Sequence, residues 1–366
     1  MENHYETRWF KPDDLSQFLA CFKLVFGSSM SEEYWRWKYR KNPLIEENAP
    51  IIVTEEVDTG KAVGFRGCVP TRLKYKGDII KAIYFADVMV HPDHRRFGIN
   101  TKMIEFAQSK FKDSLYRIYY NFPRTATHMG NIKTGFRSVC QVTDLLLVTN
   151  PKKLADAMFS GWFYRNLIPP IYGVYSLLKM PLTKSENKVT LEPCKPEDAS
   201  DIYNVWHETM DKIHTVRDSQ YIKWRFEDIS QCDPAFFIIS RDGEPQGYFI
   251  VTKKQDETDS MILSDYVVVN NDLVVFSEAI AKLVDKYRKK SSLMTWAFTV
   301  PEFHNYLKGR GFMESTKFPL KDYVTQRTFV TRPTNLDEDG RQWYLSGTDI
   351  SQLDSWYLTP SDTDIM

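Results

Sequence analysis

The sequence predicts an α/β protein, a mixed α+β fold made of two tandem domains, each a mostly antiparallel central sheet flanked by helices. Two observations lead to this prediction. Short runs with the pattern of strands surround amphipathic helices, as in a sheet that helices cover. The order of these runs in residues 1–150 then returns in residues 189–333, which indicates a repeated domain.

The bulk composition is that of an ordinary globular protein. The 366 residues suffice for two domains, and 42% of them are hydrophobic and 26% charged. Lys+Arg and Asp+Glu both number 48, so the net charge is zero. Nucleic acid is therefore not expected as a partner, and binding must depend on local features.

The cysteines and the apolar runs bound the cellular location. Five cysteines lie far apart without Cys-x-x-Cys spacing, so neither a disulfide framework nor a metal site is predicted. They are Cys21, Cys68, Cys140, Cys194 and Cys232. The N-terminus lacks the apolar core of a signal peptide, and no uncharged apolar run of about 18 residues could span a bilayer. A cytoplasmic location is expected.

The first domain is expected to begin with a helix and a strand meander. Asp13 or Asp14 can cap a helix that runs through Phe22. Strands are predicted at 51–54, 62–69 and 71–75. The aromatic and basic segment 33–43 has two interpretations, a surface helix whose aromatic residues pack inward or a lip around a substrate. Inward packing is favoured, because Trp35 and Tyr39 share a helical face.

The stretch 83–111 is the centre of the first domain. Ile83–Val90 is apolar on both faces apart from Asp87, which is typical of a buried central strand. Pro92 ends this strand. The helix that follows begins after Gly98 and buries one face, formed by Ile99, Met103, Ala107 and Phe111.

The start of this helix is suited to a phosphate group. A helix N-terminus has unpaired N–H groups and the positive end of the helix dipole, so it favours an anion. Gly98 lets the anion approach, and Arg95 and Arg96 add positive charge and fork-shaped donors. The segment is therefore predicted to cradle a pyrophosphate.

The segment resembles the acyl-CoA-binding motif of the GCN5-related N-acetyltransferases (GNAT). In that family a strand is followed by Arg/Gln-x-x-Gly-x-Gly/Ala and a helix. Arg95 and Gly98 match this motif, whereas Asn100 stands where Gly or Ala is usual. The run Val-His-Pro-Asp-His at 90–94 is typical of the family, and Gly135-Phe136 matches its Gly-Phe turn.

The resemblance implies acetyl-CoA as co-substrate and no metal. The acyl-pantetheine would lie where the cradle strand and the next strand, 116–122, splay apart, and it would bond to backbone of the cradle strand. The residues expected to contact the cofactor are Val88, Met89, Val90, Arg95, Arg96, Phe97, Gly98, Ile99, Asn100, Thr101 and Asn121.

Direct attack of an amine on the thioester requires a base and an acid. Asp87 is a candidate base, because burial in an apolar strand would raise its pKa. Asp265, at the same place in the second copy, argues for a structural role instead. His128 is a second candidate with the same objection, because His304 matches it.

The acid of the reaction has no obvious residue. Many family members place a tyrosine shortly before the Gly-Phe turn, and that position falls near Asn131 here. Tyr119, Tyr120 or water is expected to replace it. His91 and His94 flank the cradle and are expected to face phosphate or water.

Residues 189–333 repeat the first domain in the same order. The matched segments include Lys11-Pro-Asp-Asp-Leu with Lys195-Pro-Glu-Asp-Ala, Ala86–Val90 with Ser264–Val269, and Gly135-Phe136 with Gly311-Phe312. After Val269 there is neither an arginine pair nor a glycine before the next helix. The second copy is therefore predicted to have lost the cradle and to shape or support the first, unless it binds CoA in another way.

Two segments lie outside the repeat. Residues 151–188 form an apolar linker, and its part 162–182 is expected to pack between domains. Contact with a membrane surface is the alternative, although the basic face of an interfacial helix is thin. The acidic, aromatic tail 334–366 is expected to pack on a domain, because exposed aromatics this dense usually dock.

The function implied by the resemblance is acyl-CoA-dependent N-acetylation of a small-molecule amine. The cradle run and the tandem form look similar to bacterial members found in surface-polysaccharide contexts, so an amino sugar is the suggested acceptor. One alternative is a non-catalytic CoA-binding or scaffold protein. Another is an aminoacyl-tRNA-dependent transferase, since peptidoglycan-bridge enzymes use two such folds, but the zero net charge disfavours it. The sequence carries no signal for an oligomeric state.

Overall fold

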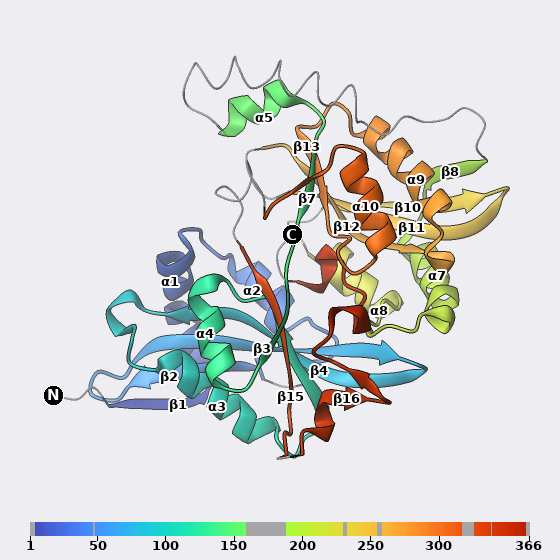
Figure 1. Ribbon diagram of the computed structural model, residues 1–366. Coiled ribbons are helices and arrows are strands. Elements are labelled where there is room, and N and C mark those ends of the chain that lie inside the picture. Colours follow the sequence, from blue (N-terminus) through green and yellow to red (C-terminus); the bar gives the residue numbers. More distant parts are fainter. Residues whose placement is uncertain are drawn as a thin grey trace. The chain divides into compact units, whose positions relative to one another are not determined.

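The computed structural model describes residues 4–46, 48–158, 188–229, 233–254, 258–316, 326–337 and 339–363. The chain forms two compact units, one of Met1–Val142 with Arg327–Trp356 and one of Thr143–Gln326 with Tyr357–Met366. Each has a mostly antiparallel sheet flanked by helices (Figure 1), so the predicted fold class is confirmed. Most of the predicted linker, including 162–182, lies outside the described residues.

The sheet of the first unit runs in the order β1-β2-β3-β4-β5-β15-β6, and the pair β4 and β5 is parallel. Its strands are β1 (Tyr5–Trp9), β2 (Ile51–Glu56), β3 (Lys61–Tyr75), β4 (Asp78–Val90), β5 (Tyr116–Asn121), β6 (Arg137–Gln141) and β15 (Thr328–Pro333). Its helices are α1 (Leu15–Phe26), α2 (Glu32–Tyr39), α3 (Ile99–Phe111) and α4 (Thr125–Lys133).

Two local predictions in this unit can be compared with the structure. The strands predicted at 62–69 and 71–75 are one strand, β3, because Pro70 stays paired with Ile83 of β4. The segment 33–43 contains α2, and the side chains of Trp35 and Tyr39 are buried. The inward-packing interpretation of this segment is therefore the correct one.

Helix α3 covers one face of the first sheet. Ile99, Met103 and Ala107 are buried against Phe85 of β4 and Tyr119 of β5. Phe85 and Tyr119 stack with their ring centroids 5.0 Å apart. This packing fixes α3 on the sheet, because a close-packed core leaves little freedom to move.

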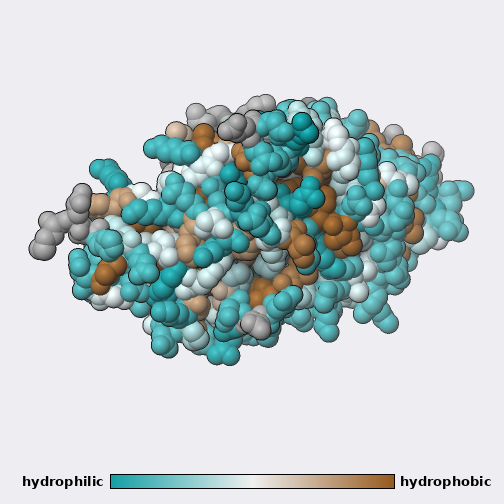
Figure 2. Space-filling model, turned by 90° about the horizontal axis from the view of Figure 1, so that it is seen from below, coloured by the Kyte–Doolittle hydropathy of each residue, from teal (hydrophilic) through white to brown (hydrophobic). Residues whose placement is uncertain are grey.

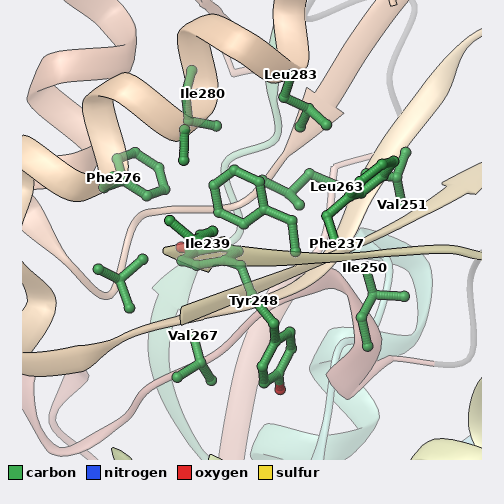
Figure 3. Close-up of a cluster of buried hydrophobic side chains, with 14 of the residues drawn as sticks. Phe237, Ile239, Tyr248, Ile250, Val251, Leu263, Val267, Phe276, Ile280 and Leu283 are labelled. Carbon is green, nitrogen blue, oxygen red and sulfur yellow. The ribbon is translucent and has the colours of Figure 1, made fainter. Parts of the chain in front are cut away.

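The sheet of the second unit runs in the order β14-β7-β13-β12-β11-β10-β8. Its strands are β7 (Leu145–Val148), β8 (Val189–Pro193), β10 (Ala235–Arg241), β11 (Glu244–Lys253), β12 (Met261–Val268), β13 (Ser292–Thr295) and β14 (Met313–Glu314). Its helices are α5 (Pro151–Met158), α7 (Pro196–Thr209), α8 (Ser219–Ile222), α9 (Leu273–Lys286) and α10 (Pro301–Gly309). Phe276, Ile280 and Leu283 of α9 point towards the sheet and form part of the core (Figure 3).

The two sheets share one order of strands, and each includes a strand from a distant part of the chain. In the first sheet β15 lies between β5 and β6, and in the second β7 lies between β13 and β14. Because β7 follows β6 directly in sequence, the chain passes to the second unit at Val142 and not near residue 150 as predicted. The segment 137–148, which contains β6 and β7, is therefore divided between two sheets, and the pattern of so short a segment does not reveal which sheet receives each strand.

The segment predicted as a tail is shared between the units. Trp343, Ile350 and Trp356 are buried within the first unit. Tyr357 and Asp362 are buried within the second. The segment is thus an integral part of both cores.

On the face drawn in Figure 2, hydrophilic residues cover most of the surface and hydrophobic ones form smaller areas. Among the described residues, no helix is long and apolar enough to cross a membrane. The same part of the chain contains no group of His, Cys, Asp or Glu side chains that could hold a metal ion.

Candidate functional site

The start of α3 is an open helix end. Gly98 is its N-cap residue, with φ 74° and ψ 7°, and no side chain caps the helix. Arg96 has a φ of 71°, so the loop turns tightly in front of the helix. A Cβ atom on Gly98 would meet no other atom within 4 Å. The space beside Gly98 is therefore open and the N–H groups of the first turn carry no side-chain cap, as an anion site requires.

The side chains around this helix end divide into two groups. Arg95, Arg96 and Phe97 are exposed, and Arg95 Nε donates a hydrogen bond of 3.4 Å to the carbonyl oxygen of Val90. Ile99 is buried in the core, so only its backbone is available to a ligand. The basic loop thus presents guanidinium groups beside the N–H groups of α3.

The corresponding helix of the second unit is closed by its own side chain. Asp272 precedes α9, and its Oδ1 accepts hydrogen bonds from Val274 N at 2.8 Å and Val275 N at 3.2 Å. A carboxylate at this place satisfies the helix N–H groups and repels phosphate. The second unit thus lacks the arginine pair and the glycine, and it has an aspartate cap at the helix start instead. An Asp directly before an apolar helix is a sequence signal for such a cap.

We expect Asp272→Ala to lower the free energy of unfolding by about 1 kcal/mol, because α9 loses its cap. Denaturant unfolding measures this change. Asp285→Ala, in the last turn of the same helix, is the matched control. Its exposed pair with Arg288 is worth less than about 0.5 kcal/mol. Equal effects of the two substitutions would contradict the capping role.

The strands β4 and β5 part before β4 ends. Their last paired residues are Tyr84 and Tyr120. Beyond them β4 continues to Val90, paired with β3, and its register shifts where the single residue Arg66 faces two residues of β4, Asp87 and Val88. One of the two, Asp87, has a φ of 44°. This β-bulge in a left-handed conformation marks a locally strained backbone of the kind found at functional sites.

The predicted base Asp87 lies in a buried ion pair. Its Oδ2 accepts hydrogen bonds from Lys38 Nζ at 2.8 Å and from the hydroxyl of Tyr39 at 2.6 Å. Both partners belong to α2 and are buried. Asp265 of the second unit accepts from Arg217 Nε at 2.9 Å and from the hydroxyl of Tyr248 at 2.8 Å. In each unit a paired aspartate therefore anchors the corresponding strand, β4 in the first unit and β12 in the second.

The predicted histidines also have partners within the unit that contains them. His128 Nε2 lies 2.8 Å from Ser138 Oγ, and His304 Nε2 lies 3.1 Å from Glu314 Oε1. In both units this contact joins a helix to the strand that follows it. Beside the cradle, His94 Nδ1 lies 3.1 Å from the hydroxyl of Tyr5.

The two neighbouring tyrosines of β5 face opposite sides of the sheet. The hydroxyl of Tyr119 donates a hydrogen bond of 3.1 Å to the carbonyl oxygen of Ala107, and burial raises its pKa. Tyr120 contacts Tyr84 with ring centroids 5.3 Å apart, and also packs near Trp356. Asn121 follows on the face of Tyr119, where it is buried and its Oδ1 has no hydrogen-bond partner among the described residues.

Arg66 is a residue of this site that the sequence prediction missed. Its side chain is fully buried, and its Nη2 donates a hydrogen bond of 2.6 Å to Asn100 Oδ1. Asn100, the departure from the motif, also explains Gly130 of α4, because a Cβ there would collide with the Asn100 amide. An arginine inside the apolar run from Val63 to Val69 was the available signal.

The structure places the predicted cofactor residues in three adjoining elements. Val88, Met89 and Val90 end β4, residues 95–101 form the loop and first turn of α3, and Asn121 ends β5. Met89 is buried, so only its backbone is available there. An open helix start beside a strand that parts from its parallel neighbour is the arrangement that the resemblance to the GCN5-related N-acetyltransferases implies.

Comparison with known proteins finds a family model that matches part of the chain. Residues 6–132, within the first unit, match a model described as an acetyltransferase (GNAT) domain. No curated protein sequence matches the chain.

Solved structures with the same fold cover most of the chain. A GCN5-related N-acetyltransferase from Anabaena variabilis superposes with a TM-score of 0.62 at 13% identity, over 91% of this chain and 73% of its own. A probable N-acyltransferase from Enterococcus faecalis gives 0.60 at 10% identity, over 93% and 74%. N-myristoyltransferase of Saccharomyces cerevisiae with bound myristoyl-CoA gives 0.58 at 11% identity, over 97% and 89%. Because these structures cover nearly the whole chain, their fold spans both units.

Proposed function

We propose that the protein is an acyl-CoA-dependent N-acyltransferase whose first unit binds the CoA. The observation that carries this proposal is the uncapped start of α3, opened by Gly98 and flanked by Arg95 and Arg96. Anions bind such helix ends because the N–H groups and the helix dipole act together. The match of residues 6–132 to an acetyltransferase (GNAT) domain supports the same function.

Each element around the cradle has a proposed role. The N–H groups of Ile99, Asn100 and Thr101, with Arg95 and Arg96, hold the pyrophosphate. The backbone of Val88–Val90, which runs past the end of the β4–β5 pairing, bonds to the pantetheine. Asn121 lies across the parting strands and offers its buried amide to the same ligand.

The reaction is attack of an unprotonated amine on the thioester carbonyl. The bulge at Asp87 supplies backbone groups beside the thioester, and the bonds from Lys38 and Tyr39 hold it in place. We assign Asp87 this positioning role, because Lys38 and Tyr39 already hold its carboxylate. Tyr120 and His128 are retained as candidates for proton transfer.

The donor and acceptor are proposed at the level of chemical class. Acetyl-CoA is the simplest donor, and an amine of a small molecule, such as an amino sugar, is the acceptor. A longer acyl group is the second candidate, favoured by the fold shared with N-myristoyltransferase, which binds myristoyl-CoA. Parallel calorimetric titrations with acetyl-CoA and myristoyl-CoA distinguish the two donors.

Gly98→Glu is expected to lower the affinity for acetyl-CoA by at least about a hundredfold, the loss of roughly two charge-assisted hydrogen bonds. The new carboxylate stands against the pyrophosphate, and φ 74° at this position strains any residue with a Cβ. Isothermal titration calorimetry measures the affinity. One site per chain is expected for the wild type.

Gly27→Glu is the matched control for the strain. Gly27 has a φ of 77°, and a Cβ there would also meet no atom within 4 Å. It ends α1 instead of starting α3, so this substitution carries the same backbone cost and added charge without touching the cradle. Loss of CoA affinity in both variants, or in neither, would remove the cradle from the proposal.

A further inference from the structure

Arg66 of β3 holds a positive charge inside the first unit. Its side chain is fully buried, its guanidinium lies 4.6 Å from the ring centroid of Phe85, and its Nη2 bonds to Asn100. Its Nε and Nη1 have no hydrogen-bond partner among the described residues. Buried arginines normally have all their donors paired, so this one has donors left for a ligand.

Among the residues that the structure describes, no carboxylate forms an ion pair with Arg66. Burial lowers its pKa to about 10, so the guanidinium still carries its charge at neutral pH. The titratable group that acts on it is Cys68, and burial raises the pKa of that thiol to about 12, so the thiol stays neutral. Asn100, to which Arg66 bonds, stands in the first turn of α3. The positive end of the helix dipole therefore lies near Arg66 and adds to the positive potential there.

The position of Arg66 is fixed by its two contacts. Phe85 follows Tyr84, the last residue of β4 that pairs with β5. Asn100 belongs to the helix start proposed to hold the pyrophosphate. The guanidinium therefore lies between the cradle and the point where the strands part. Asn121, on the strand across that point, is buried with its Oδ1 unpaired among the described residues.

We propose that Arg66 binds the sulfur end of CoA and stabilises the thiolate that leaves during acyl transfer. This inference rests on the proposed function, and it supplies a stabilising group in a chain in which Asn131 stands near the position of the family's tyrosine. In the reaction the amine nitrogen forms a bond to the thioester carbon, and the C–S bond breaks with its electron pair on sulfur. The proton lost by the nitrogen passes to solvent or to the thiolate. Arg66 stays protonated and contributes charge and N–H donors.

The test is the ionisation of the thiol of bound CoA, followed by the ultraviolet absorbance of the thiolate during a pH titration. The complex with desulfo-CoA is subtracted, which removes the titration of the protein's own tyrosines. In the wild type the bound thiol should ionise about 1–3 pH units below free CoA, because an opposite charge lies beside it. In Arg66→Met this lowering should disappear, and Arg66→Lys should retain part of it.

Binding of desulfo-CoA separates this inference from the function on which it rests. The wild type and Arg66→Met should bind desulfo-CoA within about twofold of each other, because the phosphates stay on α3. A larger loss would assign Arg66 to another part of the cofactor and overturn the proposal, as would equal thiol ionisation in wild type and Arg66→Met. If Arg66→Met does not fold, equal ionisation in free CoA and in the wild-type complex would overturn the proposal as well. A wild type that binds no desulfo-CoA removes the proposed function itself.

Discussion

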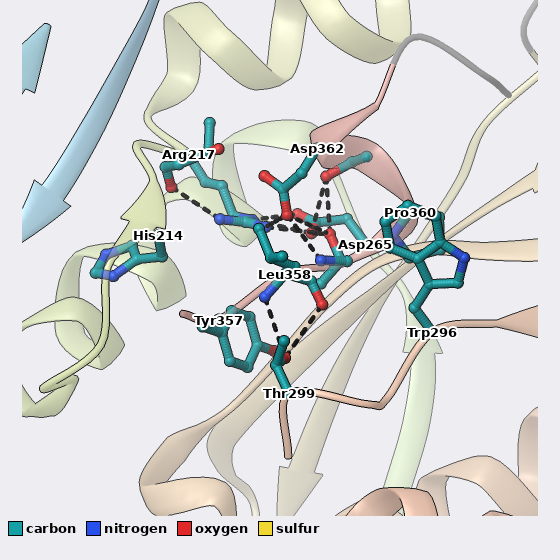
Figure 4. A network of polar contacts seen from close by, with 12 residues as sticks. His214, Arg217, Asp265, Trp296, Thr299, Tyr357, Leu358, Pro360 and Asp362 are labelled. Carbon is teal, nitrogen blue, oxygen red and sulfur yellow. Dashed lines mark hydrogen bonds and ion pairs between the residues drawn. The ribbon is translucent and has the colours of Figure 1, made fainter. Parts of the chain in front are cut away.

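Asp265→Asn is expected to lower the free energy of unfolding by about 3–5 kcal/mol, the largest effect of any substitution considered for the second unit. Asp265 and Arg217 are both fully buried, and Arg217 Nη2 also contacts Asp362 Oδ2 at 3.0 Å (Figure 4). The hydroxyls of Tyr248 and Thr359 lie within 2.8 Å of the Asp265 carboxylate. An amide at position 265 removes one of the two carboxylates that face the Arg217 guanidinium, and water cannot replace it in this buried place.

Denaturant unfolding followed by circular dichroism measures this loss, and Asp259→Asn is the matched control. Asp259 pairs with Lys153 at 2.5 Å and Lys290 at 2.8 Å, but its side chain is 25% exposed. A pair at the surface is worth at most about 1 kcal/mol, because water and salt screen it. A loss below about 1 kcal/mol in Asp265→Asn would show that the buried network does not hold the second unit together.

The second large effect is expected from dividing the chain where its sequence pattern suggests. A fragment of residues 1–150 should show no cooperative unfolding transition. It lacks β15, which pairs with both β5 and β6, and it carries β7 without a partner sheet. Removing an inner strand exposes two sheet edges and opens the core between them.

A rearranged fragment provides the control for this experiment. Residues 1–142 joined by a short Gly/Ser loop to 327–356 contain the complete first unit. The N–H of Val142 donates to the carbonyl oxygen of Arg327 at 2.9 Å, so a short loop can connect the two pieces. Thermal unfolding by circular dichroism should be cooperative for the rearranged fragment alone. A cooperative transition in the 1–150 fragment would contradict the exchange of strands.

Local sequence was sufficient to predict the strand, basic loop and helix around Gly98, because strand pattern, helix period and left-handed glycine are properties of neighbouring residues. The repeat was predictable for the same reason, since matched segments such as those of Asp87 and Asp265 return in one order. The partners of these aspartates were not. Lys38 and Arg217 come from distant segments, and nothing in their own neighbourhood marks them as buried.

The exchange of β7 and β15 between the two sheets could likewise not be predicted from the local sequence pattern. Leu145–Val148 has the pattern of a buried strand whichever sheet receives it, and the choice depends on pairing with β13. Arg66 was predictable only in part. Its apolar setting was visible in the sequence, but the face of β3 on which it lies follows from the register with β4. Such residues become candidates only when the sheet is assembled.

The last described residues of the chain complete the second unit. The hydroxyl of Tyr357 donates a hydrogen bond of 2.7 Å to the carbonyl oxygen of Tyr266, in the part of β12 that lies beyond its pairing with β13. The N–H of Leu358 bonds to Thr299 Oγ1 at 3.1 Å, and Asp362 joins the network of Arg217 (Figure 4). In the first unit the corresponding stretch of β4 is the one proposed to receive CoA.

This arrangement affects how the chain folds during its synthesis on the ribosome. Domains usually fold one after another as they emerge, the N-terminal one first. Here the first unit needs β15 and Trp356, and the second needs Tyr357 and Asp362. Neither core can close until these residues have been synthesised. The nascent chain therefore exposes two unfinished sheets together, and it depends on chaperones or on rapid late closure to avoid aggregation.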